Sequence, residues 1–450
     1  MRPISLHDTR TGKVQTLEPR DSPNVGIYAC GPTVYGRIHV GNARPFVVFS
    51  LLKRFLMHEG YVVTFVANVT DVNDKIYAAA QAAGVPSDDL ARDMTAAYIA
   101  DTDRLALGRP DHEPLASQTI DDMIELIGEL IERGHAYAAN GDVYFSVRSY
   151  PQYGEISHRR VDEMDQGEGI EGEERKRDPL DFALWKAQKP GEDTAWDAPW
   201  GRGRPGWHIE CSAMAEALLG LDFEIHGGGS DLVFPHHENE AAQTAAARDT
   251  PLSRLWVHNG MVRLDRAKMA KSAGNIFVLG EALDEYGRDA LIMYFCGGHY
   301  RQPIEFDADR LSEATAKVDR IREAARQLSA GPSPSWSQPL RDWFFDALAD
   351  DFNTPEALAR TFEWVREANR AGADVGDADL REMLGVLGLE NLVDRDDTQA
   401  PPEVLKLLDE RESARAHRNF TEADRLRERL RELGWEVRDG AAGPELLPAK

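Results

Sequence analysis

Residues 25–67 read VGIYACGPTVYGRIHVGNARPFVVFSLLKRFLMHEGYVVTFVA. The apolar run at 25–30 and the β-branched run at 61–67 each predict a strand. Residues 46–59 lie between them, are apolar on most faces and stop at Gly60, which predicts a helix. A strand, a crossover helix and a second strand form a βαβ unit, and such units build parallel sheets. We therefore predict an α/β fold with a doubly wound parallel sheet.

Similar signals continue through the first 300 residues. We expect further strands at 223–226 and 255–258 and a further helix at 238–247. A middle block interrupts the pattern with a helix at 117–133, a hairpin-like stretch at 135–147 and a charged, glycine-rich tract at 164–177. We interpret this block, about 115–205, as an insertion into a first domain that spans residues 1–305.

After residue 305 only helical patterns remain, which predicts a helical bundle at 306–393. Its expected helices lie at about 310–328, 340–349, 355–371 and 378–387. The stretch 394–402 is rich in aspartate, ends in two prolines and predicts a linker. Beyond it we expect a small domain at 403–450, with helices at about 403–416 and 421–433 and a strand at 435–438.

The composition limits the class of protein. The chain has 450 residues, more than a single core usually serves, so two or three domains are expected. Its net charge of −25 argues against indiscriminate nucleic-acid binding, although residues 401–450 carry ten basic against eleven acidic residues. Three cysteines suit a reducing compartment. No signal peptide or membrane span is evident. We expect a cytoplasmic protein without a membrane partner and favour a monomer, while the sequence leaves the oligomeric state open.

Two segments carry metal-ligand chemistry, namely GWHIEC at 206–211 and HGGGSDLVFPHHENE at 226–240. His236 and Glu240 stand four residues apart, so on a helix their side chains leave the same face. Cys211 adds a soft thiol, and Cys30, far back in the chain, can supply a fourth ligand. Zinc prefers this mixture of thiol, imidazole and carboxylate, so the pattern predicts a zinc site. The alternative is a pair of buried small thiols and a solvated helix face.

Two loops suit phosphate binding. His39-Val-Gly41-Asn42 joins the first strand to its helix, where open α/β sheets bind ligands. Gly41 lets the backbone approach a phosphate, the helix N-terminus attracts negative charge, and His39 can donate to a phosphate in the transition state. The alternative is that this turn merely starts the helix. Lys268-Met-Ala-Lys271-Ser272 follows the strand near 255–264, and two lysines three apart can clamp nucleotide phosphates, although such loops are also common on surfaces.

Together the two loops resemble the signatures of class I aminoacyl-tRNA synthetases, in the same order. Within that class the chain resembles the cysteinyl-tRNA synthetase family in four blocks, CGPTVY at 30–35, NVTDVNDK at 68–75, and the segments 206–211 and 226–240. The likeness runs from about residue 4 to 445. Val40 stands where the family usually has Ile, and Ala270 where it usually has Ser. Both lysines remain, so we expect at most a modest effect on rate.

The resemblance implies a Rossmann-type catalytic domain, a helical bundle and a C-terminal domain that binds the tRNA anticodon. It implies an enzyme that activates L-cysteine with ATP and magnesium to cysteinyl-adenylate and transfers it to tRNA(Cys). One zinc ion would receive the substrate thiolate; its implied ligands are Cys30, Cys211, His236 and Glu240, with His237 as a neighbour that does not bind. The implied catalytic residues are His39, Gly41, Asn42, Lys268, Lys271 and Ser272, of which His39, Gly41 and Lys271 bind ATP. Thr70, Trp207 and Asp231 are candidates for the cysteine pocket, although Trp207 alternatively packs in the core.

Two other functions stay open at this point. A related ligase that joins cysteine to an aminosugar in mycothiol synthesis would share the zinc site and the adenylation chemistry. The C-terminal domain and the blocks HHENE and NDK favour the synthetase. A non-catalytic, zinc-stabilised RNA-binding protein is disfavoured by the intact His39, Lys268 and Lys271.

Overall fold

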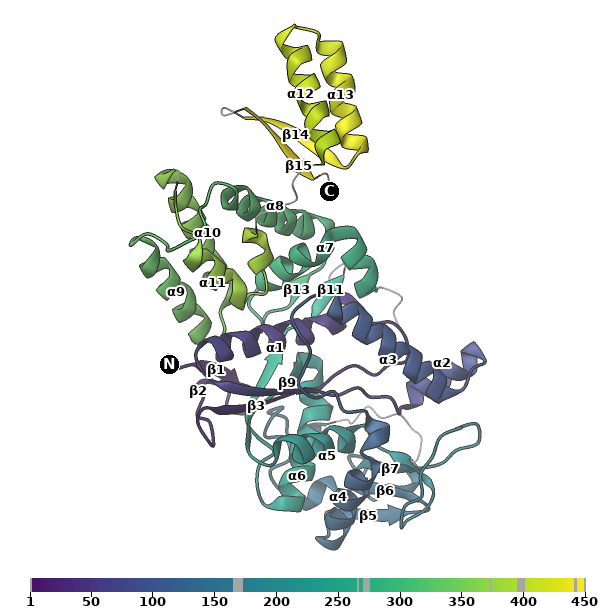
Figure 1. Ribbon diagram of the computed structural model, residues 1–450. Helices are drawn as coiled ribbons and strands as arrows, with labels where there is room; N and C mark the ends of the chain where they lie inside the picture. Colours follow the sequence, from purple (N-terminus) through teal and green to yellow (C-terminus); the bar gives the residue numbers. More distant parts are fainter. Residues whose placement is uncertain are drawn as a thin grey trace. The chain divides into compact units, whose positions relative to one another are not determined.

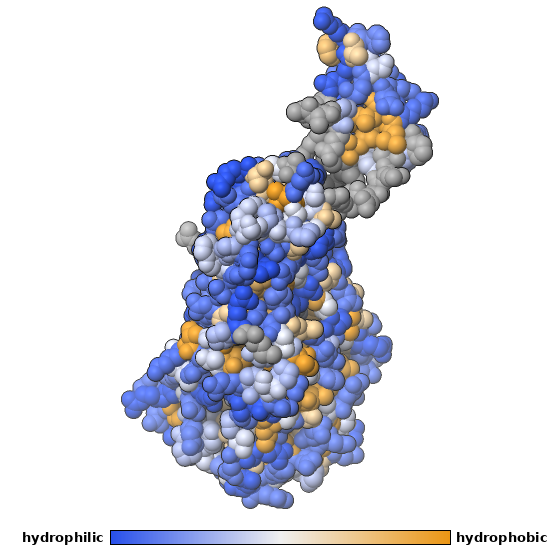
Figure 2. Space-filling model, turned by 60° about the vertical axis from the view of Figure 1, so that its left-hand side comes forward, coloured by the Kyte–Doolittle hydropathy of each residue, from blue (hydrophilic) through white to orange (hydrophobic). Residues whose placement is uncertain are grey.

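The computed structural model describes residues 2–164, 173–264, 267–269, 276–372, 374–394, 401–440 and 443–448. The chain divides into two compact units, Met1–Val393 and Asp394–Lys450. In the view of Figure 2, hydrophilic side chains cover most of the surface of the first unit, and apolar side chains form small scattered patches. No helix within the described ranges is long and apolar enough to span a bilayer.

A four-stranded parallel sheet lies at the centre of the first unit (Figure 1). Its strands are β3 (Asn24–Ala29), β4 (Val62–Ala67), β9 (Phe223–Gly229) and β10 (Ser253–Asn259), in the spatial order β10-β9-β3-β4. This confirms the predicted α/β class with a doubly wound parallel sheet.

Helices cover both faces of the sheet, with α1 (Val40–His58) on one side and α5 (Trp207–Leu219) and α6 (Glu238–Arg248) on the other (Figure 1). Successive side chains of a strand point to opposite faces. Accordingly Ile27 of β3 packs in the core that contains α1, whereas Tyr28 packs in the core that contains Ile209 of α5. Burial on both faces explains why β3 is a continuous apolar run rather than an alternating one.

The strand order places a ligand crevice between β3 and β9. From β3 the chain passes through α1 to β4 on one side, whereas β9 joins β3 on the other side. At such a reversal of direction the connections leave the two carboxyl ends apart, and a crevice forms outside them. Cys30 follows β3 at this point, and its backbone N–H donates to the carbonyl of Gly227 in β9 at 3.0 Å.

A long connection joins β4 to the start of α5, and its elements pack in both cores: Tyr98 belongs to the core that contains α1, and Met123 to the core that contains α5. Its helices are α2 (Asp74–Ala83), α3 (Ser87–Asp103) and α4 (Ile120–Glu132), and its strands are β5 (Ala136–Ala139), β6 (Asp142–Phe145), β7 (Phe182–Ala187) and β8 (Gly203–Pro205). The four strands pair antiparallel in chain order. The expected hairpin at 135–147 is confirmed as β5 and β6. Residues 165–172 of the charged tract lie outside the described residues.

Small sheets and helices complete the first unit. The strands are β1 (Ser5–Asp8), β2 (Lys13–Thr16), β11 (Val262–Leu264), β12 (Ala267–Lys268) and β13 (Ile304–Glu305), and the helices are α7 (Leu279–Cys296), α8 (Ala308–Ala325), α9 (Ser337–Ala349), α10 (Thr354–Ala371) and α11 (Ala378–Val386). Short turns of 3₁₀ helix lie at Ala116–Gln118, Val147–Ser149, Val161–Glu163, Glu173–Arg175, Ser230–Leu232 and Glu390–Val393, with a wider turn at Val233–His237. The expected helices after residue 305 are confirmed as α8 to α11.

The second unit has two helices, α12 (Pro402–Ala416) and α13 (Phe420–Glu432), and a hairpin of β14 (Trp435–Gly440) and β15 (Gly443–Pro448). It has a core of its own, built from Val404, Leu430, Trp435 and Val437. The second strand of the hairpin was not predicted, because residues 443–448 contain two prolines and only two strongly apolar side chains.

Candidate active site

A cavity of about 340 Å³ opens at the carboxyl ends of the central strands. Among the residues that line it are 30–33 after β3, His39, Gly41 and Asn42 at the start of α1, Gly229 and Asp231 at the end of β9, and 259–262 at the end of β10. Trp207 at the start of α5 also lines the wall. The segments that carry the sequence motifs therefore converge on one crevice.

The four predicted metal ligands lie together and are buried. Cys30 directly follows β3, Cys211 comes from α5, His236 from the turn before α6 and Glu240 from the first turn of α6. Their donor atoms lie within 4.8 Å of one another. His236 Nε2 is 3.0 Å from Glu240 Oε1. Two thiols, an imidazole and a carboxylate at this spacing have the donor chemistry of a zinc site.

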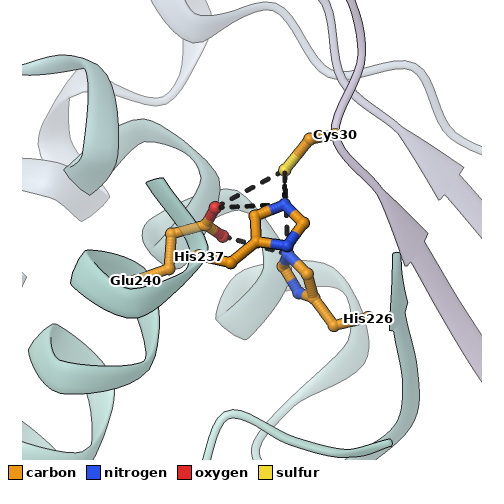
Figure 3. A group of neighbouring side chains, drawn as sticks. All are labelled: Cys30, His226, His237 and Glu240. Carbon is orange, nitrogen blue, oxygen red and sulfur yellow. Dashed lines mark hydrogen bonds and ion pairs between the residues drawn. The ribbon is translucent and has the colours of Figure 1, made fainter. Parts of the chain in front are cut away.

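A second set of donors overlaps the first and shares Cys30 and Glu240 with it (Figure 3). His237 Nε2 lies 3.3 Å from the Cys30 sulfur, and His226 Nε2 lies 3.1 Å from Glu240 Oε2. Figure 3 shows both imidazoles directed at the thiol and the carboxylate. The family resemblance implied that His237 is a neighbour that does not bind, but its ring nitrogen lies as close to the shared donors Cys30 and Glu240 as a ligand requires.

Charges in the cluster favour cation binding. Burial raises the pKa of the Cys211 thiol, but the hydrogen bond with Cys30 and the nearby His236 outweigh it and lower the value to about 6. Burial also raises the pKa of the Glu240 carboxyl, while His226 and His236 hold it well below its usual range. Burial lowers the pKa of His236, but Glu240 and Cys211 raise it to about 10, so a metal ion bound here would displace the proton of His236.

Neighbouring rings fix the imidazoles of the cluster. His236 stacks on Trp207, with ring centroids 4.1 Å apart, and its Nδ1 lies 2.9 Å from Nδ1 of His208. His237 Nδ1 lies 2.7 Å from Nε2 of His258, whose other nitrogen lies 2.7 Å from the Thr9 hydroxyl. Partners of this kind orient metal-binding imidazoles.

Three histidines in or beside the cluster were not predicted from the sequence, namely His208, His226 and His258. His208 and His226 stand within the two quoted blocks, and His258 ends a predicted strand. Four histidines within two short blocks were the available signal, but residue spacing alone does not give the direction in which each ring points.

Two hydrogen bonds fix the turn at His39. His39 caps α1, because its Nδ1 accepts from the backbone N–H of Asn42 at 3.2 Å and its own N–H donates to the Asn42 side chain at 3.4 Å. This reciprocal cap starts the helix at Val40 rather than at 46. A Cβ at Gly41 would lie 2.9 Å from the His39 ring, so the glycine leaves room for the imidazole.

The remaining predicted residues lie in different surroundings. Asp231 is exposed and lines the cavity. Thr70 is buried and is not among the residues that line it; its hydroxyl accepts from the Asn68 side chain at 3.3 Å, and its carbonyl accepts from the Val34 N–H at 3.1 Å. Thr70 thus supports the loop after β3.

The lysine loop is described only in part. Lys268 belongs to β12, which pairs antiparallel with β11 with Arg263 opposite Lys268. Met269 is buried and lines the cavity, so the chain reaches the crevice just before the loop. Lys271 and Ser272, together with Ala270, lie outside the described residues.

Comparison with known proteins identifies the family. A model of the class I (C) tRNA synthetase catalytic domain matches residues 16–316, one of the DALR domain matches 343–390, and one of the cysteinyl-tRNA ligase anticodon binding domain matches 397–443. The chain belongs to the cysteine–tRNA ligase family of class I aminoacyl-tRNA synthetases. The resemblance stated from the motifs is therefore confirmed.

Relatives in this family match along their whole length. The cysteine–tRNA ligase of Pseudothermotoga lettingae is 45% identical and that of Alkalilimnicola ehrlichii 46% identical, each over 98% of both chains. Among solved structures, a methionyl-tRNA synthetase of Mycobacterium tuberculosis in complex with methionyl-adenylate superposes with a TM-score of 0.60 at 14% identity, covering 82% of this chain and 88% of that one. At this identity the likeness concerns the fold alone.

Proposed function

We propose that the cavity binds L-cysteine and ATP, forms cysteinyl-adenylate and transfers the cysteinyl group to tRNA(Cys), and that a zinc ion held beside it selects the substrate thiol. The observation that carries the proposal is that Cys30 belongs both to the buried donor cluster and to the wall of the cavity that His39 and Gly41 also line. The residues proposed to recognise the thiol and those proposed to act on the phosphates therefore border the same cavity.

The first step joins cysteine to AMP. A carboxylate oxygen of cysteine attacks the α-phosphorus of ATP, the bond to the β-phosphate breaks, and pyrophosphate leaves, with magnesium as the expected partner of the phosphates. His39 lies at the N-terminus of α1, where the helix dipole and the imidazole can stabilise charge that develops on the phosphates. Lys268 and Lys271 are proposed to hold the leaving pyrophosphate, with Ser272 beside them. Asn42 acts through its cap on the His39 backbone.

The second step moves the acyl group. The terminal ribose hydroxyl of the tRNA attacks the carbonyl carbon of the adenylate, and AMP leaves. Asp231 lines the wall, where its carboxylate can bind the ammonium group of cysteine. Trp207 lines the cavity beside His236 and excludes water from the thiol end.

The ligands that we propose for zinc are Cys30, Cys211, His236 and Glu240. All four are buried, and their donor atoms are close enough to hold one ion. When bound, zinc would supply a Lewis-acidic centre that prefers a thiolate to an alcohol. This set contains two sulfurs, whereas the overlapping set with His226 and His237 contains one, and softer donors favour zinc.

The second unit is proposed to bind the tRNA. Arginines recur on its helices, among them the exposed Arg425 and Arg429 of α13, which pair with Glu422 and Glu432 on the same helix. Exchange of such surface pairs for phosphate contacts costs little. That residues 306–393 form a domain of their own, and that the protein is a monomer, stay predictions.

Cysteine-dependent exchange of pyrophosphate into ATP tests the first step. The proposal expects exchange with cysteine and, on addition of purified tRNA(Cys), charging of the tRNA. Absence of exchange in zinc-loaded protein would favour the non-catalytic RNA-binding protein. Exchange followed by ligation to an aminosugar but not to tRNA would favour the mycothiol-type ligase.

Zinc content of single variants tests the ligand set. Cys211→Ser and His236→Asn should each lower the zinc bound per chain, whereas His226→Asn and His237→Asn should retain most of it. The two pairs are matched, because all four residues are buried in the same cluster. The reverse pattern would assign the ion to the set drawn in Figure 3.

A further inference from the structure

Arg44 is a fully buried cation whose contacts are all with backbone oxygens. It belongs to the second turn of α1 and is 0% exposed. Its Nη1 donates to the carbonyls of Gly260 at 2.6 Å and Met261 at 3.2 Å, and its Nη2 to those of His299 at 3.2 Å and Gln302 at 2.8 Å. Within the described residues no carboxylate pairs with it.

This arrangement is unusual for a buried charge. Buried cations are normally paired with carboxylates, because an unpaired charge is costly to remove from water. Burial lowers the pKa of Arg44 to about 10, and the group is still a cation at neutral pH. Carbonyl oxygens are fixed parts of the backbone, so the planar guanidinium here holds two chain segments in a defined relation.

The two segments that Arg44 joins also pack on each other. The N–H of Gly260 donates to the carbonyl of Tyr300 at 2.8 Å, and the N–H of Ile304 donates to that of Met261 at 3.0 Å. A Cβ at Gly260 would lie 2.4 Å from the backbone of Gln302. Only a glycine permits this close approach, so the junction has little freedom to adjust.

This junction leads directly into residues 262–277, which carry Lys268 and Lys271 and are called the lysine segment below. Residues 260–262 line the cavity, and β11 begins at Val262 and pairs with β12, which contains Lys268. The far end of the segment is also fixed to the start of α1. The N–H of Val40 donates to the carbonyl of Phe277 at 2.9 Å, and the N–H of Leu279 donates to that of Ile38 at 3.0 Å.

In the described residues, the start of α1 is therefore attached to the lysine segment on both sides of the lysines, through Arg44 before them and through backbone bonds after them. We propose that Arg44 is a positioning residue for cysteine activation, which sets the Gly260-Met261 entrance of the lysine segment against the His39 turn. This inference rests on the proposed function. It concerns a residue that touches neither ATP nor cysteine and acts through the two signature loops.

Arg54 offers a matched control on the same helix. It donates to the carbonyl of Gly385 from both Nε and Nη2, at 2.9 and 2.6 Å, and to the carboxylate of Glu390 at 2.8 Å. It does not line the cavity. Arg54→Met therefore removes a comparable set of bonds from α1 without touching the lysine segment.

The experiment compares Arg44→Met, Arg44→Lys and Arg54→Met by single-turnover adenylate formation at saturating ATP and cysteine. The amplitude counts the active sites and the rate constant reports positioning, so loss of folded protein is separated from slow chemistry. Zinc content and the Kd for cysteine are measured on the same samples. Wild-type protein that forms no adenylate would contradict the proposed function rather than this inference.

We expect Arg44→Met to lower the rate constant per active site about 10²-fold, the effect of a small misplacement of reacting groups. Zinc content and cysteine affinity should stay within about twofold of wild type, and Arg54→Met should keep the wild-type rate constant. Arg44→Lys should lose roughly tenfold, because one ammonium group can reach only one of the two segments. A wild-type rate constant in Arg44→Met would overturn the inference, whatever the melting temperature. If that variant does not fold, a rate constant in Arg44→Lys within about twofold of wild type would overturn it.

Discussion

The indole of Trp207 stacks on the imidazole of His236, with ring centroids 4.1 Å apart and planes inclined by 19°. Trp207 lines the cavity and His236 belongs to the buried donor cluster, so the stacked rings form part of the boundary between the cavity and the cluster. A change in Trp207 should therefore affect the substrate thiol before it affects ATP.

Trp207→Leu should raise the KM for cysteine by roughly two- to tenfold, because an aromatic stack contributes about 0.5–1.5 kcal/mol beyond its buried area. The KM for ATP should change little, and Trp207→Phe should recover most of the loss. Trp343→Leu, which alters an exposed ring on α9, is the control. Equal increases in both KM values would show that Trp207 only supports the fold.

Gly41→Ala should slow adenylation by roughly 10²-fold, since the new methyl group would displace the His39 ring that the charge-stabilising role requires. Zinc content should not change. Gly128→Ala is the matched control, because Gly128 lies within α4 with no atom within 4 Å of a Cβ. Pyrophosphate exchange by Gly41→Ala at the wild-type rate would remove His39 from the mechanism.

The sheet could be predicted from the sequence because β3 and β4 are short apolar runs on either side of an apolar helical stretch. Helix α5 could not, because residues 208–215 are all buried and no polar face gives it a helical period. The start of α1 was placed late, because Val40, Gly41 and Pro45 are poor helix signals and the cap between His39 and Asn42 overrides them.

Four residues of the donor cluster could be predicted from the sequence, but the two further donors, His226 and His237, could not. The four-residue spacing put His236 and Glu240 on one face of an expected helix, and Cys211 and Cys30 stand in blocks that resemble the family. Which imidazole meets Cys30 depends on how β9 and α6 pack beside β3, and the spacing of residues along the chain does not encode that. The overlapping donors His226 and His237 emerge only in three dimensions.

Lys271→Ala should slow adenylation by roughly 10²-fold or more, because a charge-assisted contact to the transition state is lost. Binding of cysteine without ATP should barely change, as measured by equilibrium dialysis. Lys317→Ala, on the exposed face of α8, is the control for loss of a positive charge. Normal single-turnover adenylation by Lys271→Ala would exclude the residue from the clamp.

Deletion of residues 395–450 should leave cysteine-dependent pyrophosphate exchange largely intact and weaken tRNA charging. The reason is that this region forms a compact unit with its own core. Charging is measured at limiting tRNA, where affinity decides the rate. Full charging by the truncated protein would rule out a role of the second unit in tRNA binding, and loss of exchange would show that the unit supports the catalytic domain.

The central claim is that a metal centre reads the substrate sulfur, and serine tests it most directly because it replaces that sulfur by oxygen. The measurement is kcat/KM for pyrophosphate exchange with cysteine and with serine on zinc-loaded protein. A thiolate forms readily near neutral pH and is a softer ligand than an alcohol, so cysteine should be favoured by at least about 10⁴. Serine activation within about 10²-fold of cysteine, the discrimination of a merely hydrophobic pocket, would contradict the account.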